Sequence, residues 1–146
     1  MKSSAAAMAG RALIDTGAIV ALLDRNDRWH AACEAAFGQV SVPFITSEAV
    51  LTEVFHLVRR TRADASLVWG FIRSGAVALA SIEDSELSEI HVLMDRYSDR
   101  PMDFADATLV YLAKRESIST VFTIDFADFA TYRLEGRRRF RILPSY

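Results

Sequence analysis

Cysteine is nearly absent from this chain, since Cys33 is the only one among its 146 residues. An intramolecular disulfide is therefore impossible, and a reducing, cytoplasmic location is favoured. Histidine is sparse as well: His30, His56 and His91 lie far apart, and no Cys or His pair has the spacing of zinc ligands. The sequence thus gives no support to a structural zinc site. We expect Cys33 to be a small buried hydrophobic residue.

Long apolar runs and a strong net charge are missing too. No uninterrupted apolar stretch approaches the length of a transmembrane helix, so we predict no membrane association. The formal net charge of -2 creates no global basic field, and a nucleic-acid partner would need a local patch or metal ions. Residues 1–10 are alanine-rich, but Arg11 interrupts them before a signal-peptide core develops. We expect residues 1–10 to be a disordered tail, a cloning remnant or the lead-in to an alternative start at Met8, and the folded domain to span 11–146.

The composition that remains is that of one soluble domain with a packed core, because 51% of the residues are apolar and 25% are charged. Hydrophobic periodicity alternates between strand and helix along the chain. This order predicts an α/β fold, a single-domain three-layer α/β/α sandwich around a mostly parallel central sheet. The expected strands are 12–14, 40–46, 77–80, 120–124 and 140–143, and the expected helices are 16–23, 28–37, 48–61, 63–74, 85–97 and 103–115.

Asp15 stands where the first apolar strand ends, just before the turn-compatible pair Thr16 and Gly17. In an open α/β sheet, ligands bind outside the carboxyl ends of the strands, so this acid lies where a site is normally built. The alternative is a structural role as a helix N-cap or turn residue. Thr16 is also available as a cap for the helix that follows.

Three further acids occupy positions where a packed fold would not casually place them. Glu53 borders the apolar stripe of its helix, Asp106 stands in register with Leu109 and Val110, and Asp125 follows a second strand. A core-facing carboxylate needs a proton, a cationic partner or a metal, because burying an unpaired charge is costly.

If these acids converge, an empty ionised cluster is strained. Two carboxylates about 4 Å apart repel by roughly 4 kcal/mol at an effective dielectric of about 20. A divalent cation removes that conflict, and oxygen-only ligands favour Mg²⁺ or Mn²⁺ over zinc. Such an ion orients a water and stabilises the charge that develops during phosphodiester hydrolysis. The pattern therefore points to metal-assisted phosphoryl chemistry.

Taken in order, the motifs Leu13-Ile14-Asp15-Thr16, the Glu53 helix, Asp103-Phe104-Ala105-Asp106-Ala107 and Thr123-Ile124-Asp125 resemble the successive motifs of PIN domains. The resemblance spans residues 13–144 and is strongest to the VapC-type toxin ribonucleases of toxin-antitoxin modules. It implies a PIN-like domain with Mg²⁺-dependent endoribonuclease activity on RNA. It also implies a homodimer held inactive by a small antitoxin that covers the acidic groove.

By motif position, the resemblance implies that the catalytic, metal-binding acids are Asp15, Glu53, Asp106 and Asp125. It implies supporting hydroxyls at Thr16 and Thr123. We expect Asp103 to cap the helix that carries Asp106, and a direct role for Asp103 in the site stays open.

Several of these positions also have plainer interpretations. Glu53 could lie on a solvated helix face or pair with Arg59 or Arg60, and Glu48 is its alternative as the site residue of that helix. Asp128 could be a local helix cap, a surface acid or a substitute ligand.

The one dense basic run lies near the carboxyl terminus. Its residues Arg137, Arg138 and Arg139 could contact RNA phosphates or an acidic antitoxin surface, or could be solvated charge around a turn. Trp29 and Trp69 have helical apolar spacing, which predicts core or dimer-interface positions.

Three functions remain to be weighed. The first is the metal-dependent endoribonuclease, and the alternative is a non-cleaving PIN-like RNA- or protein-binding module. A phosphatase with an aspartyl nucleophile is disfavoured, because Gly17 occupies the position two residues after Asp15 where such enzymes commonly carry a second acid.

Overall fold

A computed structural model describes residues 11–59, 64–100 and 102–145 of the chain. The expectation for residues 1–10 lies outside these described residues. Within them the elements run, in chain order, as β1 (Leu13–Ile14), α2 (Thr16–Leu23), α3 (His30–Phe37), β2 (Phe44–Thr46), α4 (Glu48–Val58), α5 (Ala65–Arg73), β3 (Val77–Leu79), the 3-10 turn η1 (Asp84–Glu86), α6 (Leu87–Arg96), α7 (Phe104–Glu116), β4 (Thr120–Phe122), α8 (Phe126–Thr131), the 3-10 turn η2 (Glu135–Arg137) and β5 (Arg141–Leu143).

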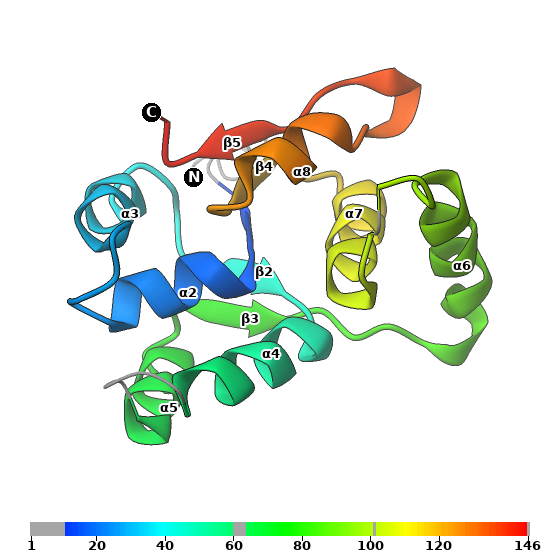
Figure 1. Cartoon of the computed structure of the whole chain (residues 1–146). Helices are drawn as coiled ribbons and strands as arrows, with labels where there is room; N and C mark the ends of the chain where they lie inside the picture. Colours follow the sequence, from blue (N-terminus) through cyan, green and yellow to red (C-terminus); the bar gives the residue numbers. More distant parts are fainter. Residues whose placement is uncertain (1–10, 60–63, 101, 146) are drawn as a thin grey trace, which may run out of the picture.

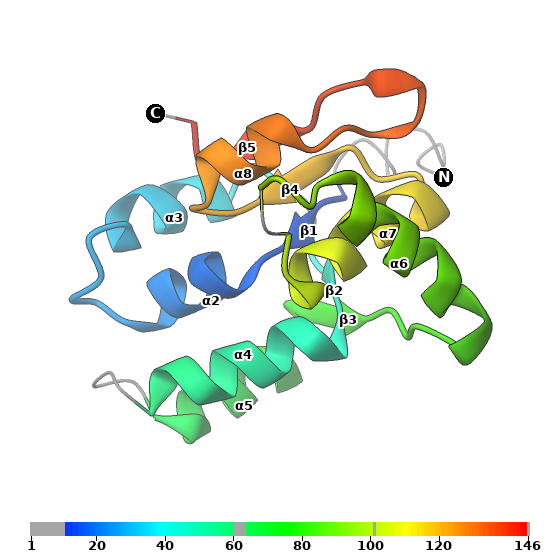
Figure 2. The same cartoon turned by 45° about the vertical axis from the view of Figure 1, so that its right-hand side comes forward.

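The five strands form one parallel sheet in the order β3-β2-β1-β4-β5, with β1 in the centre. Helix α3 lies on one side of the strands, and α6 and α7 lie on the other (Figures 1 and 2). The α/β class and the parallel sheet predicted from the alternation of elements are confirmed. The helix and strand order therefore follows from periodicity alone.

Element boundaries are where the prediction fails. The expected strand at 40–46 is shortened to Phe44–Thr46, and the expected helix at 85–97 divides into η1 and α6. Helix α8 was not predicted, because it has only six residues and too few turns for a clear apolar period. The expected helices 48–61 and 63–74 meet at residues 60–63, which lie outside the described part.

The central strands are buried on both faces, as expected for a parallel sheet covered by helices. Leu13, Ile14, Val121 and Phe122 are fully buried, and Phe122 packs edge-on against Phe44 with ring centroids 5.4 Å apart. Cys33 is buried as predicted, and burial raises the pKa of its thiol to about 11.

The two tryptophans differ from each other in burial. Trp29 is half-buried against Phe126, with ring centroids 5.1 Å apart. A core position for Trp69 is wrong, because this residue is 52% exposed. Its ring packs over that of the half-buried Phe55, with ring centroids 5.2 Å apart. Helical spacing identifies the apolar face of α5 but does not say whether another element covers it.

Parallel topology brings the ends of β1 and β4 to one edge of the sheet. The Asp15 backbone N–H donates to the Phe122 carbonyl at 2.9 Å, and the Thr123 N–H donates to the Leu143 carbonyl at 2.9 Å. Gly17 packs so tightly on the loop after β4 that an added Cβ would lie 2.6 Å from Ile124 Cγ1. This close approach places the start of α2 beside Asp125.

None of the helices in the described ranges combines the length and the apolar character needed to cross a membrane.

Candidate active site

Four of the predicted acids, Asp15, Glu53, Asp106 and Asp125, are carried by elements that meet at the sheet edge where β1 and β4 end, and we call this region the acidic edge. Asp15 is only 2% exposed there. Its Oδ1 accepts a hydrogen bond from the Thr16 N–H at 2.8 Å, and its Oδ2 accepts one from the Thr123 hydroxyl at 2.9 Å. Asp15 is the N-cap of α2, so the expectation that Thr16 caps this helix is wrong. The hydrogen bond that caps α2 does not remove the charge-bearing carboxyl group of Asp15. The same side chain can therefore be both the helix N-cap and a site acid.

The Thr123 hydroxyl also ties down the loop that follows β4. Its oxygen accepts a hydrogen bond from the Asp125 N–H at 2.9 Å while donating to Asp15. Asp125 itself faces solvent at the start of α8. One buried hydroxyl thereby links two of the predicted acids, although they lie 110 positions apart in the sequence.

Glu53 reaches the same edge from the middle of α4. Its Oε1 accepts a hydrogen bond from the Thr16 hydroxyl at 3.1 Å, across the packing of α2 against α4. No ion pair joins Glu53 to Arg59 among the described residues, and Arg60 lies outside them. Glu48 is exposed in the first turn of α4, where an acid favours the helix dipole.

Asp106 lies in the first turn of α7 and is 7% exposed. The Asp103 side chain caps α7 by accepting from the Asp106 N–H at 2.8 Å, which confirms the predicted cap. Asp106 Oδ2 accepts a hydrogen bond from the hydroxyl of the fully buried Tyr132 at 2.8 Å. No local sequence signal marks Tyr132, which follows an unpredicted helix and matches no motif.

Burial and mutual repulsion shift the acids away from their ordinary ionisation. Burial, followed by the charges of Asp106 and Asp125, holds the pKa of Asp15 well above its usual value of 3.8. Burial also raises the pKa of Asp106 to about 7, helped by Asp103, Asp125 and Asp128 and opposed by the Tyr132 hydrogen bond. The repulsion acts between carboxyl groups on elements that are distant in sequence, so the acidic edge carries one continuous region of negative potential.

Glu53 and Asp125 belong to this field. Burial raises the pKa of Glu53, with Asp103 as the next cause, and burial raises that of Asp125, with Asp128 as the next cause. Asp128 lies in the first turn of α8 and forms an ion pair with Arg100 at 2.8 Å. Asp128 is thus a paired acid at the margin of the cluster, and no hydrogen bond of its own caps α8 among the described residues.

The donor chemistry suits a hard divalent cation, because every candidate ligand is a carboxylate oxygen and the field is uncompensated. The spacing is looser than that of a formed metal centre. Across the described ranges 11–59, 64–100 and 102–145, no three His, Cys, Asp or Glu side chains lie close enough to share one ion. The cluster therefore fits a hard divalent cation in charge and ligand type, without a preformed coordination shell.

The matching family model is that of the PIN domain, over residues 12–133. The chain belongs to the PIN-domain family. Ribonuclease VapC26 of Mycobacterium tuberculosis is 31% identical over 134 residues, which cover 90% of this chain and 99% of that protein. The predicted resemblance to VapC-type PIN domains is confirmed.

A solved structure shows the same PIN fold. VapC20 of Mycobacterium tuberculosis, described as a Sarcin-Ricin loop cleaving toxin, superposes with a TM-score of 0.68 at 22% identity, covering 80% of this chain and 92% of that one. At this identity the likeness concerns the fold alone.

A hydrogen bond between two buried hydroxyls, those of Ser47 and Thr108, joins helices α4 and α7 of this PIN domain. Ser47 caps α4, accepting from the Val50 N–H at 3.2 Å, and its hydroxyl lies 2.8 Å from that of Thr108 on α7. Both residues are buried. Because α4 carries Glu53 and α7 carries Asp106, this contact fixes the relative position of two acid-bearing helices. Thr108 was missed, since a threonine inside a helix has no distinctive sequence signal.

The three arginines of the basic run separate in the structure. Arg137 lines a cavity beside α6 and α7, and the Arg138 side chain donates to the Glu135 carbonyl at 3.3 Å. Arg139 is exposed and does not line that cavity. Among these three, Arg137 alone is therefore placed in a concave surface of the PIN domain.

Proposed function

We propose that this protein is a Mg²⁺-dependent endoribonuclease that hydrolyses RNA phosphodiester bonds, with Mn²⁺ as a possible substitute, and that it acts as the toxin of a toxin-antitoxin pair. One observation carries the proposal: Asp15, at the end of β1, lies in the electrostatic field of Asp106 from α7 and Asp125 after β4. Family membership and the 31% identity to Ribonuclease VapC26 support the same reaction.

We assign metal binding to Asp15, Glu53, Asp106 and Asp125, whose oxygens are the ligand type that Mg²⁺ prefers. A bound divalent ion supplies a water of lowered pKa and offsets charge on the phosphodiester. The chain's own groups orient the acids. Thr123 holds Asp15, Thr16 holds Glu53 and Tyr132 holds Asp106, each by a hydrogen bond of 2.8 to 3.1 Å.

The partners follow from the same proposal. A small antitoxin would cover the acidic edge, and two copies of the chain would form a homodimer in the cytoplasm, where cellular RNA lies. Size-exclusion chromatography with light scattering tests the dimer directly. A monomer mass at micromolar protein would remove the homodimer from the proposal.

Cleavage of a labelled RNA by the purified, antitoxin-free protein tests the reaction. We expect cleavage with added Mg²⁺, none with excess chelator, and a loss of at least about a hundredfold in D15N and D106N, because each replaces a charged carboxylate ligand by a neutral amide. The matched control is D95N, which removes an exposed acid on α6. Unchanged cleavage in D15N and D106N would overturn the assignment.

Binding separates the remaining alternative from the enzyme. RNA binding by the wild-type protein with no cleavage at any Mg²⁺ or Mn²⁺ concentration would indicate a non-cleaving RNA-binding module. Hydrolysis of phosphomonoesters without activity on RNA would instead indicate a phosphatase.

A further inference from the structure

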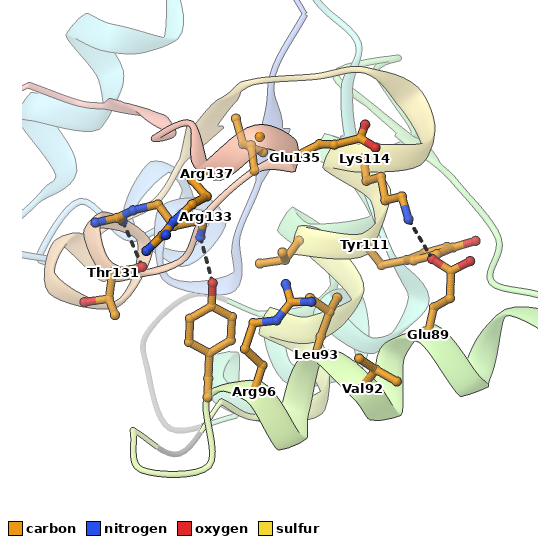
Figure 3. A pocket seen from close by; sticks show the side chains of 14 residues that line it. Glu89, Val92, Leu93, Arg96, Tyr111, Lys114, Thr131, Arg133, Glu135 and Arg137 are labelled. Carbon is orange, nitrogen blue, oxygen red and sulfur yellow. Dashed lines mark hydrogen bonds and ion pairs between the residues drawn. The ribbon is translucent and has the colours of Figure 1, made fainter.

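A cavity of about 950 Å³ lies on the side of α7 that faces α6. Its walls come from α6, α7 and the segment 131–137, as Figure 3 shows. Its apolar part includes Val92, Leu93, Val110 and Leu134, with the rings of Tyr97 and Tyr111 beside them. The cavity is separate from the acid cluster, because none of the predicted metal-binding acids lines it.

The charged lining is mainly basic. Four cationic side chains, Arg96, Lys114, Arg133 and Arg137, face two acidic ones, Glu89 and Glu135. This excess is local, since the whole chain carries a net charge of -2. A concave basic surface on an acidic protein favours an anionic ligand.

Two of the four cations are already engaged. Lys114 Nζ pairs with Glu89 at 3.1 Å, and the Arg133 guanidinium donates to the carbonyls of Ala130, Thr131 and Tyr132 at the end of α8. The ion pair offsets the charge of Lys114, and the three carbonyl bonds hold the Arg133 side chain in place while it keeps its positive charge.

Arg96 and Arg137 are different. Both are exposed, and neither side chain makes a hydrogen bond or ion pair with any described residue. They come from opposite walls, Arg96 from the last turn of α6 and Arg137 from η2, and Figure 3 shows the Arg96 guanidinium extending from α6 toward the segment that carries Arg137.

The backbone at Arg137 is strained in the conformation that presents this side chain. Its φ is 62°, in the left-handed region that L-residues with a side chain avoid. The preceding Gly136 has φ 71° without such strain, and the Arg137 N–H donates to the Leu134 carbonyl at 3.0 Å to close the turn. Strain of this kind is concentrated at functional positions.

The cavity is joined to the acid cluster by two short routes. Along α7, Val110 is one turn and Lys114 two turns beyond Asp106, or roughly 6 Å and 12 Å. Across the aromatic wall, the Arg133 N–H donates to the Tyr97 hydroxyl at 2.9 Å, and Tyr97 packs edge-on against Tyr132, which holds Asp106. A strand of several nucleotides can span both places.

We propose that this cavity is a subsite for the RNA backbone on one side of the scissile bond, in which Arg96 and Arg137 pair with successive phosphates. The proposal rests on RNA being the substrate, as argued above. Tyr97 and Tyr111 line the cavity but are themselves largely buried, so the wall offers little ring surface for stacking and the subsite binds RNA with little base preference. Its contribution is affinity for the backbone.

Metal-free binding of labelled RNA tests the subsite independently of cleavage. We compare wild type with R96Q/R137Q by fluorescence anisotropy, using a tetranucleotide and a dodecanucleotide of single-stranded RNA. The double variant should bind the dodecamer about tenfold more weakly or worse, because charge-assisted hydrogen bonds are lost. The slope of log K against log salt should fall by about 1.4, or 0.7 for each phosphate contact on a single strand. The tetramer should bind equally to both.

The matched control is R25Q/R73Q, which removes two exposed arginines elsewhere on the surface and should leave both RNA affinities unchanged. Circular dichroism and thermal unfolding check that each variant is folded. Equal dodecamer affinity and salt slope in R96Q/R137Q and wild type would overturn the subsite. Binding of an acidic hexaglutamate peptide is measured for the same two proteins. If R96Q/R137Q keeps its RNA affinity but loses binding of this peptide, the subsite is also overturned, because the cavity would then dock protein.

Cleavage measured in parallel distinguishes the two proposals. With Mg²⁺, R96Q/R137Q should raise KM for the dodecamer and leave kcat unchanged. If the wild type cleaves nothing but the double variant still loses dodecamer affinity, the ribonuclease assignment fails and the subsite stands.

Discussion

The hydroxyl of Tyr132 donates a 2.8 Å hydrogen bond to Asp106 Oδ2, and the two residues lie on different elements, beyond α8 and at the start of α7. Both are buried. The bond stabilises the carboxylate form of Asp106 against the burial that disfavours it, and burial and the carboxylate together raise the pKa of the Tyr132 hydroxyl above its usual value. Tyr132 is therefore a positioning residue that acts through Asp106.

Replacing Tyr132 by phenylalanine should change the pH profile of RNA cleavage. Without the hydroxyl, the pKa of Asp106 rises further, so the acid limb of kcat/KM should move to higher pH and kcat at neutral pH should fall about tenfold. The control is Y97F, which removes a hydroxyl that contacts only the Arg133 N–H among the described residues. Equal pH profiles for Y132F and Y97F would contradict the role.

The stability of the metal-free protein should decline as pH rises from about 4 to about 7. The Asp106 pKa is raised from 3.8 to about 7 in the folded state, so the fold binds more protons than the unfolded chain in that window. The stabilising effect of this proton is fully present below about 4 and is lost as pH rises through about 7. At roughly 1.4 kcal/mol per pKa unit, a few kcal/mol are involved. Urea unfolding with chelator present, repeated across this range, measures the slope.

The variant D106N isolates that contribution. Because asparagine accepts from Tyr132 without a charge, D106N should show a shallower decline than wild type and be more stable above about pH 7, while the raised pKa values of Asp15, Glu53 and Asp125 keep part of the slope in place. D95N, which removes an exposed acid, should keep the wild-type slope. A D106N curve parallel to wild type would show that Asp106 is not the group responsible.

Replacing Thr123 by valine should weaken the fold and the site together. The change keeps the shape but removes the group that donates to Asp15 Oδ2 and accepts from the Asp125 N–H. Leaving buried polar groups unsatisfied costs about 1–3 kcal/mol each, so we expect a loss of at least about 2 kcal/mol in unfolding free energy. T120V changes a buried threonine on β4, three residues before Thr123, whose hydroxyl has no hydrogen bond to a described residue, and it should cost far less. A comparable loss in both would contradict the assigned hydrogen bonds.

Gly17 tests the close approach of α2 to the loop that carries Asp125. In G17A the new Cβ would meet Ile124 Cγ1 at 2.6 Å and Cδ1 at 2.8 Å, so the Ile124 side chain must shift. We expect a loss of about 1–3 kcal/mol in stability and reduced RNA cleavage. G70A in α5 meets nothing within 4 Å and should stabilise the protein by about 0.5–1 kcal/mol. Thermal unfolding of both variants gives the comparison. Unchanged stability in G17A would show that the Ile124 side chain shifts at no measurable cost.

The sequence was sufficient to predict a mostly parallel sheet, the succession of its strands and longer helices along the chain, and the candidate acids. Period-two and period-3.6 patterns indicate element type locally, and Asp15 at a strand end and Asp103 before α7 are local signals as well. The motif order also identified the family. Short pieces such as α8 and η1 were missed because a single turn carries too few apolar positions to show a period.

What only the tertiary structure decided is which groups meet. Thr16 and Glu53 are 37 positions apart, Thr123 and Asp15 are 108, and each pair is joined by one hydrogen bond. Tyr132 and Arg96 carry no local sign of a role, because their roles come from neighbours on other elements. Periodicity records only which face of an element is buried. The pairing of one buried polar group with another depends on how the elements pack, since each must find its partner in the space that the core leaves.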